Sequence, residues 1–387
     1  MKILYDHQIF SVQKYGGISR YFYELMNQFS KMKDISFDLA LKNTRNFYIL
    51  NNSELFNVEK DIRTDNFCGG LQFWGKAELQ RFLGRMSIID HPEIKNLKTS
   101  DELLEKSDYD VFHPTYFDNY FINNLKKPFV LTVYDMIYEI YSERFFKNTN
   151  RFIRKQKELI NKATHIIAIS ENTKKDIIDI CNIGEEKISV VYLGNSFNYT
   201  KSDIFDLTLP EKYILYVGDR HIYKNYEFFL KSIKPLLIKD KDLFLICAGS
   251  VGLSSKEKQF LISNRLADKV IHLPLIDDKV LMNLYSRAFC FVFPTLYEGF
   301  GIPILEAFSC GCPAVLSNTS SLPEVGGDDA AVYFDPEDSE SILEAVRNVI
   351  SSSTQRDNLR QKGYEQLKKF SWRKCAVETK KVYESVI

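Results

Sequence analysis

The chain of 387 residues carries 51 basic and 51 acidic side chains, with 45% hydrophobic and 26% charged residues. This composition is ordinary for a soluble protein and lacks the basic excess of a nucleic-acid binder, so we expect no nucleic-acid partner. A chain of this length exceeds what one hydrophobic core usually supports, which predicts two domains.

The first residues, MKILYDHQIF, form a short apolar run that Asp6 and His7 interrupt, so they lack the apolar core of a signal peptide. No uncharged stretch reaches membrane-spanning length, and we therefore expect a cytoplasmic protein. The seven cysteines are odd in number and scattered, which favours reduced thiols. Cys310 and Cys312 form the only close pair, and a C-x-C without a second Cys or His cluster is weak evidence for a metal site.

Short apolar runs alternate with amphipathic stretches of helical period, a pattern that predicts parallel strands joined by crossover helices. The strands predicted in the first half are 3–5, 37–42, 111–113, 129–135, 165–170 and 188–193. Those predicted in the second half are 213–218, 243–249, 270–275, 290–295, 313–318 and 331–336. The fold class is therefore α/β, with two doubly wound, Rossmann-like domains that face each other.

Residues 194–212 are polar and aperiodic, which predicts a linker between the two sets of strands. We assign residues 1–195 to an N-terminal domain, 196–209 to the linker and 210–370 to a C-terminal domain. Ligands of open parallel sheets bind beyond the carboxyl ends of the strands, so two such edges across a hinge predict a deep cleft.

Two segments lack the alternation of predicted strands and helices. Residues 45–108 include LQFWGKAELQRFLGRM and are predicted to form an irregular helical insertion. Residues 144–163 are basic and aromatic, which suits contact with the anionic inner face of a membrane. We prefer the alternative of a solvated helix whose apolar side chains, including Leu159 and Ile160, turn inward.

The stretch YEGFGIPILEAFSCGCPAV combines a glycine-broken turn with a short helix that begins near Pro303. Gly299 and Gly301 let the backbone approach a ligand closely, and the free N–H groups of a helix start favour an anion. We therefore predict a phosphate or diphosphate at this turn.

Two glutamates flank this turn. Glu298 precedes the helix start, where its charge would repel a phosphate, so we expect it to accept hydrogen bonds from neutral hydroxyls. Glu306 lies one turn into the helix, where a carboxylate can accept from the vicinal hydroxyls of a ribose. Without further motifs, two glutamates at this spacing would indicate a charge that caps the helix and a solvated side chain. A phosphate between two groups of hydroxyls, however, describes a nucleotide sugar.

Residues 293–338, which contain this stretch, closely resemble the E-x7-E region of retaining glycosyltransferases of family 4, which have the two-domain GT-B fold. The resemblance continues through YILYVGDRHIYKN (213–225), ISENTKKDI (169–177), TVYDM (132–136) and GGISRY (16–21). It covers nearly the whole chain. The resemblance implies transfer of a sugar from a nucleotide sugar, with retention at the anomeric carbon.

The resemblance also implies roles for single residues in the C-terminal domain. Glu306 would bind the nucleotide ribose, and Glu298 would contact hydroxyls of the donor sugar. The backbone N–H groups that would face the sugar and phosphates belong to Gly299, Phe300, Gly301 and Ile302.

Arg220 and Lys224, in GDRHIYKN, match basic residues that lie against the donor diphosphate. Cations there stabilise the charge that grows on the departing nucleoside diphosphate. Many relatives carry another basic residue where this chain has Tyr223. In the first domain, Gly16 and Gly17 precede a helical pattern and would present a second glycine-led helix start to the phosphates or to the acceptor.

Two further matches lie at strand ends of the first domain. His113 matches a family histidine over the donor sugar and would bind the sugar or assist proton transfer. Asp135 lies on the acceptor side, after Tyr134, where relatives often have a histidine. The C-terminal helix, 371–387, is predicted to pack back on the first domain.

The preferred function is transfer of mannose from GDP-mannose to a saccharide acceptor, lipid-linked and at the inner face of the membrane, in bacterial O-antigen or capsule synthesis. A UDP-hexose is the second choice of donor. No D-x-D pair occurs at a matching place, so we expect no metal and no other cofactor. The alternatives are a GT-B epimerase or hydrolase, a hinged binding protein, and a nucleotide redox enzyme, which the lack of G-x-G-x-x-G after the first strand disfavours.

Overall fold

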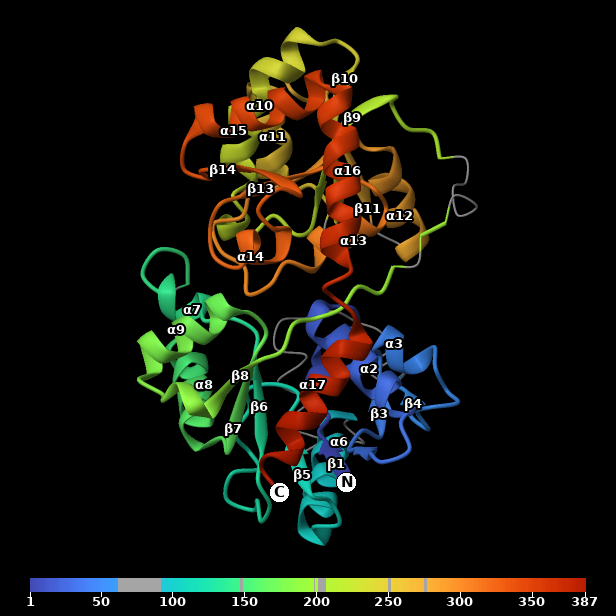
Figure 1. Ribbon diagram of the computed structural model, residues 1–387, viewed down its shortest axis with the longest axis vertical. Coiled ribbons are helices and arrows are strands. Elements are labelled where there is room, and N and C mark those ends of the chain that lie inside the picture. The colour runs from blue at the N-terminus through green and yellow to red at the C-terminus, as the bar shows by residue number, and fades with distance from the viewer. Residues whose placement is uncertain (62–91, 147–148, 198, 201–206, 250–251, 275–276) are drawn as a thin grey trace.

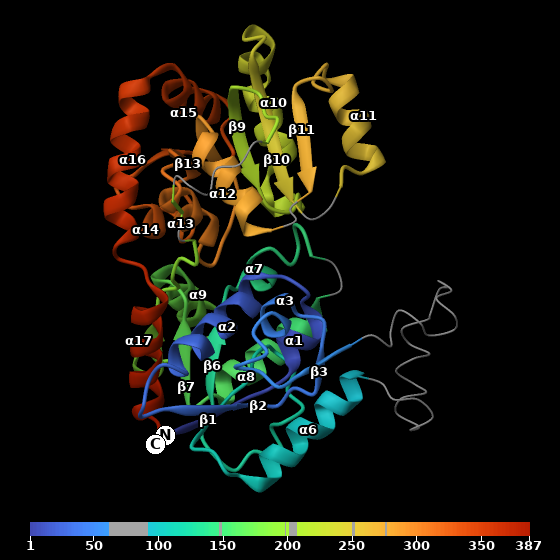
Figure 2. The same ribbon diagram turned by 90° about the vertical axis from the view of Figure 1, so that its right-hand side faces the viewer.

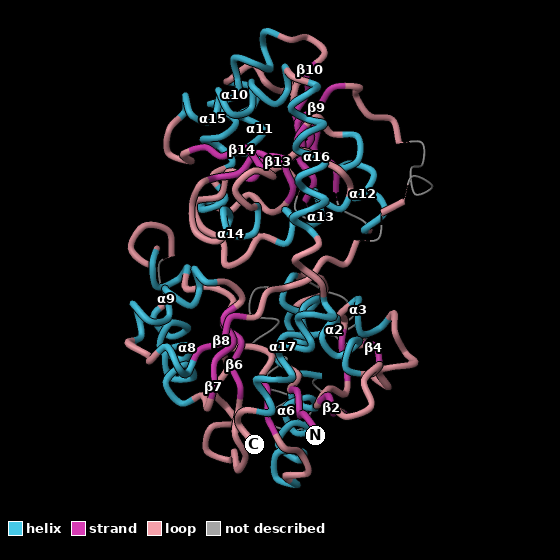
Figure 3. The backbone as a smooth tube through the Cα atoms, viewed as in Figure 1, coloured by secondary structure: helices cyan, strands magenta, loops and turns pink. Residues whose placement is uncertain are grey.

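The computed structural model describes residues 1–61, 92–146, 149–197, 199–200, 207–249, 252–274 and 277–387. Its strands form two groups, one in each half of the chain, and each group is surrounded by helices (Figure 1). The secondary structure of the two halves alternates between strand and helix along the chain (Figure 3). The two α/β domains expected from the apolar runs are therefore present.

The sheet of the N-terminal domain consists of two parallel, three-stranded parts. Their strand orders are β2-β1-β5 and β6-β7-β8, and an isolated parallel bridge between Phe112 and Phe129 connects them. The strands are β1 Lys2–Tyr5, β2 Ser36–Leu39, β5 Val111–His113, β6 Val130–Val133, β7 His165–Ala168 and β8 Ile188–Val190. Ile3 pairs with both Phe37 and Val111, so β1 is the middle strand of its part.

The sheet of the C-terminal domain is parallel, with the order β11-β10-β9-β12-β13-β14. The strands are β9 Lys212–Val217, β10 Leu243–Gly249, β11 Val270–Pro274, β12 Cys290–Phe293, β13 Ala314–Ser317 and β14 Ala331–Phe334. The order reverses between β9 and β12, which is where a doubly wound sheet usually binds its ligand.

Helices cover both sheets. Those of the N-terminal domain are α1 Gln8–Val12, α2 Gly17–Phe29, α3 Phe47–Leu50, α6 Pro92–Lys106, α7 Ile137–Ile140, α8 Asn150–Lys162 and α9 Glu171–Cys181, with a 3₁₀ turn at Glu185–Lys187. Those that follow are α10 Tyr226–Lys239, α11 Ser255–Ser263, α12 Asp278–Arg287, α13 Ile302–Ser309, α14 Leu322–Gly326, α15 Ser339–Ser351, α16 Ser353–Leu367 and α17 Trp372–Glu384, with a 3₁₀ turn at Ile222–Lys224.

Strand β9 shows why the C-terminal sheet is apolar on both faces. Ile214 and Tyr216 are buried in one hydrophobic cluster with residues of α10 and α15. Leu215 and Val217 point the other way and are buried with residues of α12 and α13. Because successive strand residues face opposite sides, a sheet with helices on both faces needs a continuous apolar run.

All twelve predicted strand runs contain strands of the two main sheets. The segment 45–108 holds α3, α6 and part of a small parallel pair that we did not predict, β3 Asn43–Thr44 with β4 Glu59–Lys60. LQFWGKAELQRFLGRM, at 71–86, lies outside the described residues. The basic segment forms α8, in which Leu159 and Ile160 are buried while Arg151 and Arg154 are exposed, as expected of a solvated helix.

The chain passes between the domains twice. The described residues between β8 and β9 form neither helix nor strand, and after α16 the chain returns so that α17 packs against α2 and β7 of the N-terminal domain. Figure 2 shows α16 and α17 in succession along one side of the molecule. At the two crossings Gly194 lies against the backbone of Trp372, whose Nε1 donates to Ser196 Oγ at 2.8 Å.

Candidate functional site

The loop before α13 is shaped by two glycines. Gly301, the N-cap residue of α13, has a φ of 101°, a left-handed conformation that side chains disfavour. Gly299 approaches the N-terminal domain so closely that an added Cβ would lie 1.7 Å from the carbonyl oxygen of Tyr134 and 3.1 Å from Cβ of Asp135. A larger residue at either position would therefore strain or displace the backbone.

Hydroxyl groups from both domains fix this loop. Within the C-terminal domain, Ser321 Oγ lies 2.9 Å from the carbonyl oxygen of Glu298 and 3.0 Å from that of Phe300. From the N-terminal domain, Ser170 Oγ donates to the carbonyl oxygen of Gly299 at 2.7 Å. The loop therefore holds its shape only while both domains contact it.

The first turn of α9 continues this contact between the domains. Glu324, from α14, accepts hydrogen bonds from the backbone N–H groups of Glu171 at 2.7 Å and Asn172 at 3.3 Å. The hydroxyl of Tyr297 donates to Asp176 at 2.5 Å. A carboxylate at a helix start also meets the positive end of the helix dipole, so the contact is favourable electrostatically.

Two glycine-led helix starts face each other across the domains. Gly16 is the N-cap residue of α2, and an added Cβ on Gly17 would lie 3.8 Å from Cδ1 of Ile302, the first residue of α13. The Oε1 atom of Gln13 accepts from the N–H of Ser19 at 3.1 Å and so satisfies one donor of the α2 start. Two helix starts in this arrangement favour an anion between or beside them.

Lys224 and Glu298 form a buried ion pair beside this loop. The Nζ–Oε1 distance is 2.5 Å, and the side chains are only 18% and 15% exposed. Burial lowers the pKa of Lys224, but Glu298, Tyr223 and Asp135 outweigh it and raise the pKa above its usual value. Lys224 is therefore a cation held next to the helix starts.

Asp135 belongs to the same group of charges. Burial raises its pKa to about 6, and Glu298 adds to the rise, while the N–H of Ile137 and the charge of Lys224 oppose it. The N–H of Ile137 donates to Asp135 Oδ1 at 3.1 Å. The structure thus brings together three predicted site residues, Asp135, Lys224 and Glu298.

Arg220 has different partners from Lys224. Its guanidinium pairs with Glu257 through Nε, donates from Nη2 to the carbonyl oxygen of Gly252 at 3.0 Å, and lies over the ring of Tyr226. Arg220 and Lys224, which were predicted to act together on the diphosphate, thus form ion pairs with different glutamates.

His113 lies inside the N-terminal domain. It is fully buried, and its ring nitrogens lie 2.6 Å from the hydroxyl of Tyr383 and 2.9 Å from Oγ1 of Thr132. Burial lowers its pKa to about 3, so the ring is neutral. Because both nitrogens have protein partners, this placement gives no support to the predicted contact with a donor sugar and indicates a structural link to α17.

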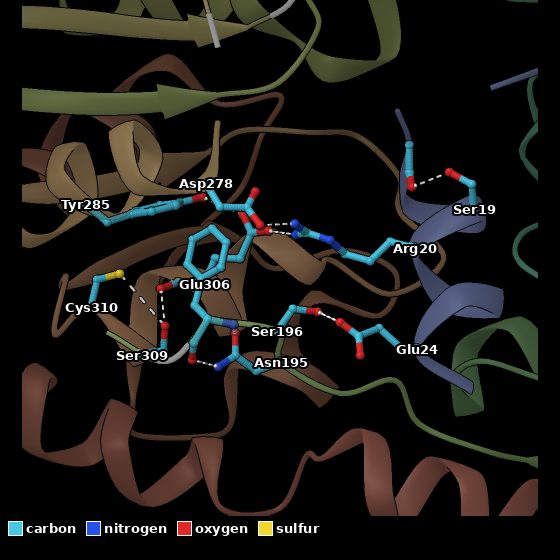
Figure 4. Close-up of polar contacts among 12 residues, drawn as sticks. Ser19, Arg20, Glu24, Asn195, Ser196, Asp278, Tyr285, Glu306, Ser309 and Cys310 are labelled. Carbon is cyan, nitrogen blue, oxygen red and sulfur yellow. Dashed lines mark hydrogen bonds and ion pairs between the residues drawn. The ribbon is translucent and has the colours of Figure 1, made fainter. Parts of the chain in front are cut away.

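Glu306 is the centre of an ion-pair group that spans the domains, shown in Figure 4. Arg20, from α2, donates from Nη1 to Glu306 Oε1 at 3.2 Å and pairs through Nη2 with Asp278, at the start of α12. The hydroxyl of Tyr285 lies 3.3 Å from Glu306 Oε2. Burial raises the pKa of Glu306 to about 7, although the charge of Arg20 opposes the rise.

Sequence reasoning missed Arg20, although it lies in the motif GGISRY. Arg20 follows Gly16 and Gly17 by about one helical turn. Because the glycine pair is expected to meet an anion, a cation at this position was a signal that could have been used. Its carboxylate partners, Asp278 and Glu306, could not be found from spacing because they are far away in the chain.

In the part of the chain that the structure describes, no group of three or more His, Cys, Asp or Glu side chains is placed to hold a metal ion. Cys310 and Cys312 are buried thiols that are not joined in a disulfide. No described helix combines the length and apolar character that a membrane crossing requires.

Comparison with protein families assigns both domains. Residues 86–195 match the family model described as Glycosyltransferase Family 4, and residues 200–366 match the one described as Glycosyl transferases group 1. Each of the two domains therefore contains a stretch that matches a glycosyltransferase family. The resemblance read from the E-x7-E region is thereby confirmed.

Relatives of the transferase include bacterial O-antigen enzymes. It is 28% identical over 381 residues to the O-antigen chain mannosyltransferase B of Escherichia coli, an alignment that covers 95% of this chain and 96% of the relative. It is 32% identical over 220 residues to the O-antigen chain mannosyltransferase RfbU of Salmonella typhimurium, covering 57% of this chain and 60% of the relative. The expected similarity to O-antigen mannosyltransferases is confirmed.

Solved structures establish the fold of the transferase. Sucrose-phosphate synthase from Thermosynechococcus elongatus superposes with a TM-score of 0.75 at 16% identity, covering 100% of this chain and 98% of that one. HepE from Anabaena, in complex with UDP and glucose, gives a TM-score of 0.73 at 15% identity, covering 99% of each chain. The predicted GT-B fold is confirmed, and at these identities the likeness concerns the fold alone.

Proposed function

We propose that the transferase moves mannose from GDP-mannose to a saccharide acceptor, with retention at the anomeric carbon, in the synthesis of a bacterial surface polysaccharide. The observation that carries the donor class is the pair of facing helix starts, where a Cβ added on Gly17 would lie 3.8 Å from Cδ1 of Ile302, with Glu298 and Glu306 on either side. The choice of mannose is supported by the full-length similarity to an O-antigen chain mannosyltransferase.

In this proposal the diphosphate lies at the helix starts and Lys224 turns from Glu298 toward it. Glu306 accepts the ribose hydroxyls, and Glu298, released from Lys224, accepts hydroxyls of the mannose. Once Lys224 has turned, this cation and the helix dipoles are placed to stabilise the charge of the leaving group. We also propose that the reaction needs no metal ion. Measurement of turnover in the presence of a chelator would test this.

The transfer proceeds on one face of the sugar. The bond between the anomeric carbon and the phosphate oxygen breaks while the acceptor oxygen bonds to the same carbon from the same side. The acceptor proton passes to the leaving phosphate oxygen, so no nucleophile of the protein takes part. Asp135, whose pKa lies near 6, is ionised at neutral pH and would orient an acceptor hydroxyl.

The acceptor is proposed to be a lipid-linked saccharide at the inner face of the cytoplasmic membrane. Such an acceptor is consistent with the O-antigen relatives, whose products are saccharide chains. We leave α8 out of this proposal, because its apolar side chains Leu159 and Ile160 are already buried in the protein.

The proposal is tested with GDP-mannose, GDP-glucose, UDP-glucose and UDP-galactose. A donor that binds the folded protein raises its melting temperature, and slow hydrolysis reports a productive complex without the acceptor. We expect GDP-mannose to give the largest shift and an α-configured sugar as the first hydrolysis product by NMR. A larger shift with a UDP-sugar would replace the donor, and a β-configured product would contradict retention.

A further inference from the structure

Arg20 enters the surroundings of Glu306 from the other domain and has no part in the function proposed so far. It follows Gly17 in α2, the helix whose start faces α13. Its guanidinium donates to Glu306 at 3.2 Å and also pairs with Asp278 (Figure 4). Both partners belong to the C-terminal domain, so one side chain connects the ribose end of the site to the opposite domain.

We propose that Arg20 is a positioning residue for the nucleotide end of the donor, because it holds the Glu306 carboxylate in the orientation that accepts the ribose hydroxyls. The inference rests on the proposed function, in which Glu306 takes these hydroxyls. It places part of the nucleotide site on the N-terminal domain, so that donor binding and the approach of the two domains favour each other.

The hydrogen bonds of Glu306 leave room for a ligand. A carboxylate offers about four lone-pair positions, two on each oxygen. Arg20 uses one position on Oε1, and the hydroxyl of Tyr285 uses one on Oε2. One position on each oxygen is left, which matches two vicinal hydroxyls. Because each oxygen has a protein partner, the carboxylate cannot rotate freely between ligands.

Arg20 is itself held in place before any ligand binds. Its side chain is 9% exposed, and its guanidinium lies 5.3 Å from the ring centre of Tyr48 and 5.8 Å from that of Phe197. Ordering a long side chain during binding costs affinity, and an arginine that is already fixed avoids this cost. Such pre-organisation is expected of a positioning residue.

The charges around Glu306 support the same role. The titratable and charged groups that face the carboxylate are Arg20 from α2 and both Asp278 and Tyr285 from α12, while Tyr48 from α3 faces Arg20. Burial and Asp278 raise the pKa of Glu306, and Arg20 is the main group that lowers it. Without Arg20 the pKa would rise further, and a protonated Glu306 accepts fewer hydrogen bonds.

The test compares GDP with 2′,3′-dideoxy-GDP, which lacks the hydroxyls in question, by calorimetry. We expect the wild-type protein to bind GDP about tenfold more tightly than the dideoxy nucleotide, the usual effect of hydrogen bonds to a charged group. In Arg20→Ala the affinity for GDP should fall about tenfold while that for dideoxy-GDP changes little. Arg20→Lys, which keeps the charge but not the planar fork, should retain part of the preference.

Arg144→Ala is the matched control, because Arg144 also pairs with a glutamate of the other domain, Glu337, at 2.8 Å. This pair is exposed and has no contact with Glu306 in the described structure. Its loss should leave the preference for GDP over dideoxy-GDP at the wild-type value. Melting curves of each variant establish that the protein is folded during titration.

The inference is overturned if Arg20→Ala weakens both nucleotides equally, since that is what a purely structural role predicts, or if it leaves GDP binding unchanged. The same pair of measurements with UDP and 2′,3′-dideoxy-UDP separates the role of Arg20 from the choice of base. If the folded wild-type protein binds none of these nucleotides, the proposed function fails first, independently of any result for Arg20.

Discussion

Two of the contacts through which the domains meet at the donor region have opposite character. The Arg20 contact joins Arg20 to Glu306 and Asp278 and consists of charges, of which those of Arg20 and Glu306 are buried. The Gly299 contact joins the carbonyl oxygen of Gly299 to the hydroxyl of Ser170 and depends on a backbone approach that an added Cβ would block. One contact is electrostatic, and the other is neutral and steric.

This difference separates two ways in which the protein can be damaged. Loss of a charge in the Arg20 contact leaves another charge buried without its partner, so the effect depends on pH and on nucleotide binding. A change in the Gly299 contact moves the backbone that presents Glu298, so the effect appears in turnover and does not follow the titration of Glu306. Variants of each contact can therefore be distinguished by pH profile and by kcat against KM.

Lys224→Ala should cause the largest loss, because it removes the buried cation beside the Gly299 contact. Loss of one group that stabilises developing negative charge costs about 100- to 1000-fold in kcat. We expect this loss in kcat for GDP-mannose, with a smaller change in KM. An effect confined to KM would assign Lys224 to ground-state binding instead.

Gly299→Ala tests the steric contact directly. The added Cβ would meet the carbonyl oxygen of Tyr134, so the loop must shift, and a misplacement of about 1 Å can cost about 100-fold in rate. We expect a fall in kcat of this order. Gly252→Ala, where an added Cβ has no heavy atom within 4 Å, is the control. Wild-type turnover in Gly299→Ala would contradict the close approach.

Glu306→Gln tests the charged contact. Glu306 binds ribose best when ionised, and its pKa is raised to about 7, so wild-type affinity for GDP should be high above this pH and fall below it. The glutamine variant cannot titrate, and we expect its affinity to be about tenfold lower at high pH and constant across the range. Calorimetry on both sides of the pKa provides the measurement. A variant that keeps the wild-type pH profile would exclude Glu306 as its origin.

Ser170→Ala should have the smallest effect, because it removes one neutral hydrogen bond from the Gly299 contact. Such a bond contributes about 1 kcal/mol, or about fivefold in kcat if the loop is held less firmly. The loss should be the same above and below the pKa of Glu306. A loss that grows as the pH falls would show that the two contacts are not independent.

Local patterns predicted the parts of the protein that depend on local sequence. The apolar runs located all twelve strands of the main sheets because buried parallel strands must be apolar on both faces. The glycines and proline after Glu298 located the start of α13, because glycine allows the left-handed turn before the helix and proline is favoured in the first turn. The short strands β3 and β4 have two residues each and leave no periodic signal.

The remaining features depend on tertiary contacts. Arg20 lies 286 positions from Glu306, and His113 lies 270 positions from Tyr383, so their partners are decided by the packing of whole domains. A histidine at a strand end is predicted from sequence to face the cleft, yet Tyr383 of α17 and Thr132 of β6 are its partners in the buried interior. The Arg220 and Lys224 side chains are close in sequence but diverge to Glu257 and Glu298.

The two crossings between the domains touch each other where Gly194 packs on Trp372. We expect the domains to rotate about this pair of crossings. We therefore expect one rotation to separate Arg20 from Glu306 and Ser170 from Gly299. The N-terminal domain would then move away from the nucleotide end and the sugar end of the site at the same time. Product release and site disassembly would then be one event.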